Sequence, residues 1–369
     1  MMSIIDRYIV RQFIASFLFG LLAFTLIFIM IDMMEKIDDF LDANAPTGTI
    51  IEYYLNFSPD IIKLMTPVAM LLAALFVMGR LTNLNELAAI KASGVSLYRI
   101  LAPFIIVALL VSTVSVYFNG WVVPAANQRK FAIERQHLQR VDSYNRFNIF
   151  FQDGRTRIIS LGYYEPQSKS ATRVSIEEFA DTNLTVLIRR FDADRMVWTS
   201  ITDSATGTAS DGWLLDYGTE RLIAGEKDSV TYFTKLAVGK LSISPDEMEK
   251  KQRKPEEMDY PELHEFIESQ QNAGQDVARW MVEYNSKIAF PFASVVVTLF
   301  GVTFGSIRRR SGVAVEFGIC VAMTFLYMGF MKTSQVFGYN GDLHPLLTAW
   351  LANLIFLGMG VVNLFRVQK

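Results

Sequence analysis

The chain has 369 residues, of which 51% are hydrophobic and 20% are charged, and its mean hydropathy is +0.26. This apolar content exceeds that of ordinary soluble domains and favours a membrane protein. The formal net charge of -2 provides no surplus of basic residues to neutralise phosphates, which argues against a nucleic-acid partner.

Six apolar runs approach or reach the roughly 20 residues that a helix needs to span a bilayer. In chain order they cover 13–34, 61–79, 100–123, 288–307, 313–331 and 345–365. The first run is longer than the apolar region of a signal peptide, roughly 7–15 residues, so we expect it to remain as an anchor. The sequence therefore predicts six transmembrane helices.

Basic residues in short loops predict the orientation, because they resist translocation. Most of them fall at one side of the predicted spans: Arg7, Arg11, Arg80, Lys91, Arg99, Arg308, Arg309, Arg310, Arg366 and Lys369. That side is predicted to be the cytoplasm, and it would hold both termini.

A hydrophilic insertion separates the spans into two groups of three and is long enough to fold as a domain. Its middle contains stretches rich in β-branched and aromatic residues between turn-forming residues, at 147–154, 156–164, 172–180, 184–198, 212–224 and 229–243. They predict an antiparallel sandwich or jellyroll-like domain, with helical connectors at 125–140 and 245–274. The predicted organisation is a membrane half at 1–123, a domain outside the cytoplasm at 124–279, and a second membrane half at 280–369.

The loop after the second span predicts a short helix within 82–94. Asn83 and Glu86 have the spacing of a capping box, and Gly94 can supply a left-handed stop. One helical face would carry Leu84, Leu87, Ala88 and Lys91. Two interpretations fit. The segment is either a solvent-exposed surface turn between two spans, or a coupling helix. In the second case its small side chains enter a groove of a soluble partner, and Glu86 contacts a basic group there.

Motifs of the common enzyme classes are absent from the sequence. It contains no G-x-x-x-x-G-K-[ST] phosphate loop, no H-E-x-x-H pair and no G-x-S-x-G elbow. One cysteine and three scattered histidines do not provide the ligand spacing of a metal site. We therefore expect a non-enzymatic chain whose energy comes from a partner.

Several stretches lie in order along the chain: "SIIDRYIVRQF", "NELAAIKASGVSLYRI", "WVVPAANQR", "YPELHEFIESQQNAG" followed by "VEYNSKIAFPFASVV", and "LHPLLTAWLANLIFLGMG". Together they resemble the LptF/LptG permeases of the lipopolysaccharide export ABC transporter. The resemblance covers essentially the whole chain, and its start and end lean towards the LptG type.

The resemblance implies an inner-membrane permease that extracts lipopolysaccharide, pairs with a paralogue and is driven by a cytoplasmic ATPase dimer. ATP and magnesium would bind to that ATPase, with no cofactor on this chain. The β domain would be a periplasmic jellyroll that continues into bridge proteins of the LptC/LptA type. The residues implied in ATPase coupling are Leu84, Asn85, Glu86, Leu87, Ala88, Lys91, Ala92, Ser93 and Gly94.

Lipopolysaccharide phosphates would favour cations at the outer ends of the spans, where the candidates are Lys36, Lys63 and Lys332. Lys36 departs from this expectation because acidic residues surround it, namely Asp32, Glu35, Asp38 and Asp39. Snorkelling is then the simpler role for Lys36. Its acidic neighbours are alternatively predicted to bind divalent cations or basic residues of the paralogue.

Two other classes of function remain open on sequence alone. A secondary transporter driven by an ion gradient would require ionisable groups near the bilayer midplane, and we find none at the centre of a predicted span. A non-transporting envelope scaffold would use the β domain for docking but would have no need of a capped inner helix.

Overall fold

The computed structural model describes residues 4–138, 147–165, 168–181, 183–202, 209–224, 227–238, 241, 243–245, 248, 253–272, 276–306 and 312–366. The chain forms two compact units. The helical unit comprises Met1–Gln139, Pro255–Gln271 and Gln275–Lys369, and the sheet unit comprises Arg140–Lys254 and Asn272–Gly274. The division differs from the predicted boundaries at 124 and 279, because most of both helical connectors packs with the membrane helices.

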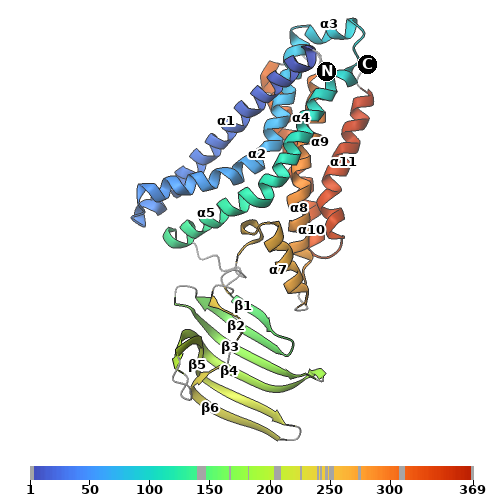
Figure 1. The fold of residues 1–369 in the computed structure, drawn as a ribbon. Coiled ribbons are helices and arrows are strands. Elements are labelled where there is room, and N and C mark those ends of the chain that lie inside the picture. Colours follow the sequence, from blue (N-terminus) through green and yellow to red (C-terminus); the bar gives the residue numbers. More distant parts are fainter. Residues whose placement is uncertain are drawn as a thin grey trace. The chain divides into compact units, whose positions relative to one another are not determined.

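The helical unit (Figure 1) contains a long α-helical hairpin, a short helix and several further helices. Its elements are α1 (Ile4–Asp42), α2 (Thr47–Asn83), α3 (Glu86–Ala92), α4 (Leu97–Tyr117), the π-helix η1 (Phe118–Val122), α5 (Val123–His137), the 3-10 helix η3 (Pro255–Glu257), α7 (Tyr260–Asn272), α8 (Ala278–Ala289), the 3-10 helix η4 (Phe290–Phe292), α9 (Ala293–Gly305), α10 (Gly312–Tyr339) and α11 (Pro345–Arg366).

Five helices in the described part of the chain are long and apolar enough to cross a membrane: Ile4–Asp42, Thr47–Asn83, Leu97–His137, Ala278–Gly305 and Pro345–Arg366. They contain the described residues of five of the six predicted spans, apart from residue 306. The remaining span, 313–331, lies within α10, whose 28 residues extend about 42 Å. The chain is therefore a multi-pass α-helical membrane protein.

Three spans are much longer than their apolar runs. α1 has 39 residues, α2 has 37, and α4, η1 and α5 form one continuous helix of 41 residues. At about 1.5 Å per residue, each exceeds the roughly 30 Å hydrocarbon core of a bilayer. The polar residues after 123 therefore extend the third span as a helix instead of forming a separate connector.

The backbones of α2 and α9 lie close together, and this contact packs the two membrane halves against each other. A Cβ atom on Gly301 would lie 2.6 Å from Ala74 Cβ, and one on Gly305 would lie 2.7 Å from Met78 Cβ. The four-residue spacing of the two glycines matches the small-residue pattern of tightly packed membrane helices. The Thr82 hydroxyl adds a hydrogen bond of 2.9 Å to the carbonyl of Gly305.

Tyr260 attaches the second connector to the membrane helices. Its ring lies against Gly120 in the π-helix, where a Cβ atom would be 2.0 Å from the nearest ring carbon. Its hydroxyl lies 3.2 Å from the carbonyl of Val116 and 3.4 Å from that of Lys287. Burial raises the pKa of Tyr260 to about 12, so the hydroxyl remains protonated and able to donate at physiological pH.

The sheet unit contains one antiparallel sheet, in which the strands follow each other in chain order. These are β1 (Phe147–Asp153), β2 (Arg157–Glu165), β3 (Ser170–Ala180), β4 (Asn183–Thr202), β5 (Ala209–Ala224) and β6 (Lys227–Ala237). All six predicted strands are confirmed, although the last predicted stretch runs past the end of β6. The described strands form a single meander rather than two packed sheets.

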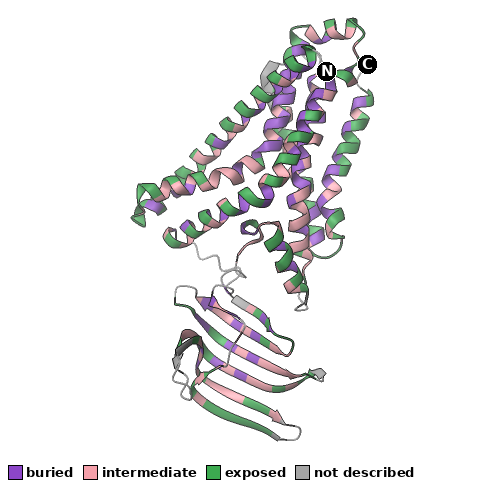
Figure 2. Ribbon diagram, in the orientation of Figure 1, coloured by how far each residue is buried: buried purple, intermediate pink, exposed green. Residues whose placement is uncertain are grey.

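One face of the sheet carries the core of this unit. Trp213 and Met196 are buried there with a cluster of aliphatic and aromatic side chains, and Figure 2 shows buried positions across the middle strands. The indole nitrogen of Trp213 donates a hydrogen bond of 2.6 Å to the carbonyl of Ile243. This bond fixes the segment after β6 against the core.

The α2–α9 contact can be tested with Gly301→Leu. We expect this variant to lose about 1–3 kcal/mol of folding free energy, because the larger side chain must separate two backbones in contact. The readout is the melting temperature of the purified protein in detergent. Gly329→Leu on α10 is the control, since a Cβ atom there meets nothing within 4 Å. Equal melting temperatures for the two variants would contradict this role of Gly301.

Candidate functional site

The predicted short helix exists as α3, between α2 and α4. Figure 1 marks both chain termini near α3, at the same end of the helical unit. Leu87 is buried and belongs to the same apolar cluster as Ile9 of α1 and Leu97 of α4. Together with Ile90, which is partly buried and packs against the same cluster, Leu87 anchors α3 to the membrane helices.

The predicted capping box is wrong. Asn83 is the last residue of α2, and the residue before α3 is Asn85, which has φ 57° and makes no side-chain capping bond. α2 continues to Asn83 because its last turn stays hydrogen-bonded, with Leu84 N donating to Arg80 O at 3.0 Å. The reversal of direction then requires a left-handed residue, a conformation that asparagine tolerates.

The predicted stop at Gly94 is confirmed. Gly94 has φ 87°, its amide donates to Lys91 O at 2.9 Å, and the amide of Val95 donates to Ile90 O at 3.4 Å. These two bonds are those of a Schellman motif, which satisfies the last carbonyls of a helix. A side chain at position 94 would be strained in this conformation.

The predicted common face is not formed as expected. Leu84 precedes the helix and is exposed, whereas Leu87 is buried. The exposed side of the segment instead carries mostly small or uncharged polar residues: Leu84, Asn85, Ala88, Ala89, Ala92, Ser93 and Gly94. Lys91 is half-buried.

Two polar contacts tie the α3 region to the start of α1, and neither was predicted. The hydroxyl of Tyr8 donates a hydrogen bond of 3.1 Å to Glu86. Arg99, in the first turn of α4, forms an ion pair of 2.8 Å with the buried carboxylate of Asp6. The partners are far apart in sequence, so no local pattern could have indicated them.

Lys36 is buried in a polar cluster formed by α1, α2 and α5. Its ammonium lies 2.9 Å from Asp32, 3.3 Å from Glu134 and 2.6 Å from the hydroxyl of Tyr53. The acidic surroundings were predicted from Asp32, whereas Tyr53 and Glu134 were missed. In this arrangement Lys36 is neither a snorkelling side chain nor a free cation.

The other two candidate lysines have different surroundings. Lys63 lies 3.8 Å from Asp60, which also lies 3.6 Å from the buried Lys130. Lys332 is exposed on α10 and has no ion pair with any residue that the structure describes. The described residues also contain no group of three or more histidines, cysteines or acids arranged to hold a metal ion.

The Lys36 cluster predicts a stability effect. Removing one partner of a buried ion pair costs about 3–5 kcal/mol, so Lys36→Ala should lower the melting temperature markedly. Adding Asp32→Asn and Glu134→Gln should restore part of it, because the unpaired carboxylates are then gone. Lys332→Ala is the matched control and should leave the melting temperature unchanged. An unaffected Lys36→Ala variant would rule out a structural role for the cluster.

Comparison with known proteins identifies the family. The family model for the lipopolysaccharide export system permease LptF/LptG matches residues 7–366. The chain is 23% identical to LptG of Escherichia coli K12, over 91% of this chain and 90% of that protein, and 22% identical to LptG of Haemophilus influenzae, over 97% of each. It is also 21% identical to LptF of Escherichia coli K12, over 97% of this chain and 94% of that protein. Relatives of both types match, so the lean towards LptG stays a prediction. The chain belongs to the LptF/LptG family of lipopolysaccharide export permeases.

Proposed function

We propose that this transmembrane permease forms a heterodimer with its paralogue and is driven by a cytoplasmic ATPase that docks on α3. ATP and magnesium bind to the ATPase, and this chain binds neither. Lipopolysaccharide leaves the inner membrane between the two permeases and passes to periplasmic bridge proteins of the LptC/LptA type. The observation that carries this proposal is the construction of α3.

α3 has the features of a docking element. Its exposed side carries Ala88, Ala89 and Ala92, which allow the backbone of a partner to approach closely. Its buried side is fixed by Leu87, and Glu86 accepts a hydrogen bond from Tyr8. A force on α3 is therefore passed to α1 and to the core of the helical unit.

The surface of α1 supports pairing with a second permease. Only 17% of the residues in the most apolar 18-residue stretch of α1 are buried. The corresponding share is 78% for the span formed by α8 and α9. Figure 2 shows α1 largely exposed along its length. The uncovered side chains include Leu18, Phe19, Leu22, Leu26, Ile27 and Met30. Such a face suits the paralogue or the acyl chains of the lipid.

The energetics of the substrate favour an apolar route. Each methylene group moved into water costs about 0.8 kcal/mol, so exposure of several acyl chains would cost tens of kcal/mol. A chain with 28 phenylalanines and 16 methionines can supply an apolar surface, and methionine adapts to irregular shapes.

The basic residues near α3 support a cytoplasmic location for this end of the helical unit. Arg7, Arg11, Arg80, Lys91 and Arg99 belong to α3 or to the neighbouring helix ends, as does Arg366 at the end of α11. Arg308, Arg309, Arg310 and Lys369 lie outside the described residues. By the positive-inside rule, we assign both termini to the cytoplasm and the sheet unit to the periplasm.

The sheet offers edges for the bridge proteins. β1 and β6 are the outer strands of the described sheet, so each has one side without a strand partner. Such edges accept an added strand from another protein. This property supports delivery of the lipid to a periplasmic partner.

Docking on α3 is tested with Glu86→Lys in the full transporter. We expect lipopolysaccharide release from proteoliposomes to fall by at least about tenfold while ATP hydrolysis persists, because reversing a charge at a docking contact costs several kcal/mol. Glu86 has two roles in this proposal, contact with the ATPase and the hydrogen bond that links α3 to α1. Tyr8→Phe separates them, since it removes the hydrogen bond but keeps the carboxylate.

Glu268→Lys, an exposed charge reversal on α7, is the matched control and should leave release unchanged. Undiminished release with Glu86→Lys, or failure of any ATPase to co-purify with the permease, would count against the docking role.

A further inference from the structure

Buried and exposed residues alternate along β3, β4 and β5. This alternation is interrupted at the same position across the three strands. Two consecutive residues are exposed on β3, Thr172 and Arg173, and two on β4, Asp194 and Arg195, whereas their flanking residues are buried. The paired register is unchanged across this level, since Thr172 pairs with Arg195 and Val174 with Ala193. The interruption is therefore a local distortion of the strands and not a shift in register. We call this distorted position of the sheet the crease.

The crease holds two bulky residues in an unfavourable backbone conformation. Arg173 has φ 52° and Tyr217, on β5, has φ 50°. Left-handed conformations are rare for such residues and persist where the surrounding structure imposes them, often at binding sites. Both side chains line the same groove.

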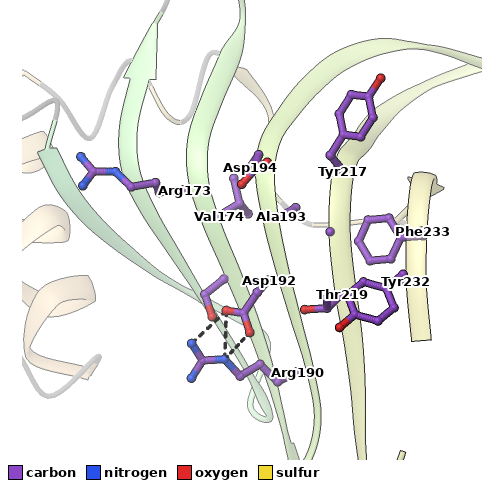
Figure 3. Close-up of a pocket in the computed structure, with 12 residues that line it drawn as sticks. Arg173, Val174, Arg190, Asp192, Ala193, Asp194, Tyr217, Thr219, Tyr232 and Phe233 are labelled. Carbon is purple, nitrogen blue, oxygen red and sulfur yellow. Dashed lines mark hydrogen bonds and ion pairs between the residues drawn. The ribbon is translucent and has the colours of Figure 1, made fainter. Parts of the chain in front are cut away.

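The groove, shown in Figure 3, has a volume of about 660 Å³ and extends over β3, β4, β5 and β6. Ser175, Asp192, Thr219 and Tyr232 form one row across these strands. The adjacent row contains Val174 and Ala193, which belong to the apolar core. Because neighbouring residues of a strand point to opposite faces, the polar row lies on the face away from the core.

Two tyrosine rings stand uncovered in this groove. Tyr217 is 67% exposed and Tyr232 is 82% exposed. Figure 3 shows Tyr217 on β5 and Tyr232 on β6. Exposed aromatic rings with a polar tip are typical of binding surfaces, because they provide contact area at little cost in side-chain entropy.

The polar groups of the groove are held in place and their charges cancel. The Arg190 guanidinium lies 2.9 Å from Asp192 and 2.9 Å from Glu177, and hydrogen bonding to Asp192 raises the pKa of Arg190. The lining contains two arginines, Arg173 and Arg190, and two aspartates, Asp192 and Asp194. A neutral ligand with many hydroxyl groups suits this lining better than a phosphate.

We propose that this groove binds an oligosaccharide, namely the uncharged sugars of the transported lipopolysaccharide. A pyranose ring has an apolar C–H face, which stacks on an aromatic ring, and a rim of hydroxyls that bond to carboxylates, guanidinium groups and hydroxyls. Tyr232 and Tyr217 supply the stacking surfaces, and Asp192, Asp194 and Thr219 supply the polar partners. The assignment rests on the proposed function, which brings a glycolipid to the sheet unit.

The test uses the full-length chain in lipid nanodiscs and the delipidated oligosaccharide released from lipopolysaccharide, with binding followed by NMR titration. Tyr232→Ala should weaken binding by about tenfold through loss of a stacking surface. Tyr232→Phe should retain most of the affinity because the ring remains. Phe150→Ala, which removes a half-exposed ring outside the groove on β1, should bind like the unmodified chain.

Three outcomes would overturn the proposal. The unmodified chain fails to bind the oligosaccharide, Tyr232→Ala binds as tightly as Phe150→Ala, or a peptidoglycan fragment binds more tightly than the oligosaccharide. Release of lipopolysaccharide by the complete transporter is measured in parallel. Normal release without oligosaccharide binding would reject the groove assignment and leave the transport function intact, whereas loss of release by the unmodified assembly would reject the transport proposal itself.

Discussion

The close approach of α2 and α9 is the constraint on which the helical unit depends. Gly301 and Gly305 remove the side chains that would hold the two helices apart, and the hydroxyl of Thr82 bonds to the carbonyl of Gly305. α2 comes from the first membrane half and α9 from the second, so this contact makes one body of two separated segments. Packed interiors of this kind resist continuous deformation, and movement is expected in the elements that surround them.

α1 has a largely uncovered middle, and its polar contacts with other helices lie near its ends. At one end Asp6 and Tyr8 contact the α3–α4 region, and towards the other end Asp32 and Lys36 contact Tyr53 and Glu134. A continuous helix joins the two sets of contacts. A displacement of α3 can therefore reach the far end of the unit through α1.

The elements that could be predicted from the sequence were those encoded locally. Apolar length indicated the spans, and β-branched residues between turn signals indicated all six strands. Long-range features escaped prediction. Asn83 was assigned as a cap because nothing local shows that α2 continues to it, and the partners of Lys36 on α2 and α5 lie up to 98 residues away. The sheet groove requires the register of four strands, which a single sequence does not provide.

The surroundings of Lys36 constrain any role in binding the substrate. Its ammonium already has two carboxylate neighbours, Asp32 and Glu134, so the group as a whole carries an excess negative charge and would repel a phosphate. A phosphate can meet Lys36 only if at least one carboxylate withdraws. Asp32 can do so by a change of its own side chain on α1, whereas withdrawal of Glu134 removes a polar contact between α1 and α5 and leaves the apolar cluster of Phe40 and Ile133 in place. The exposed Lys332 on α10 could meet a phosphate without either change.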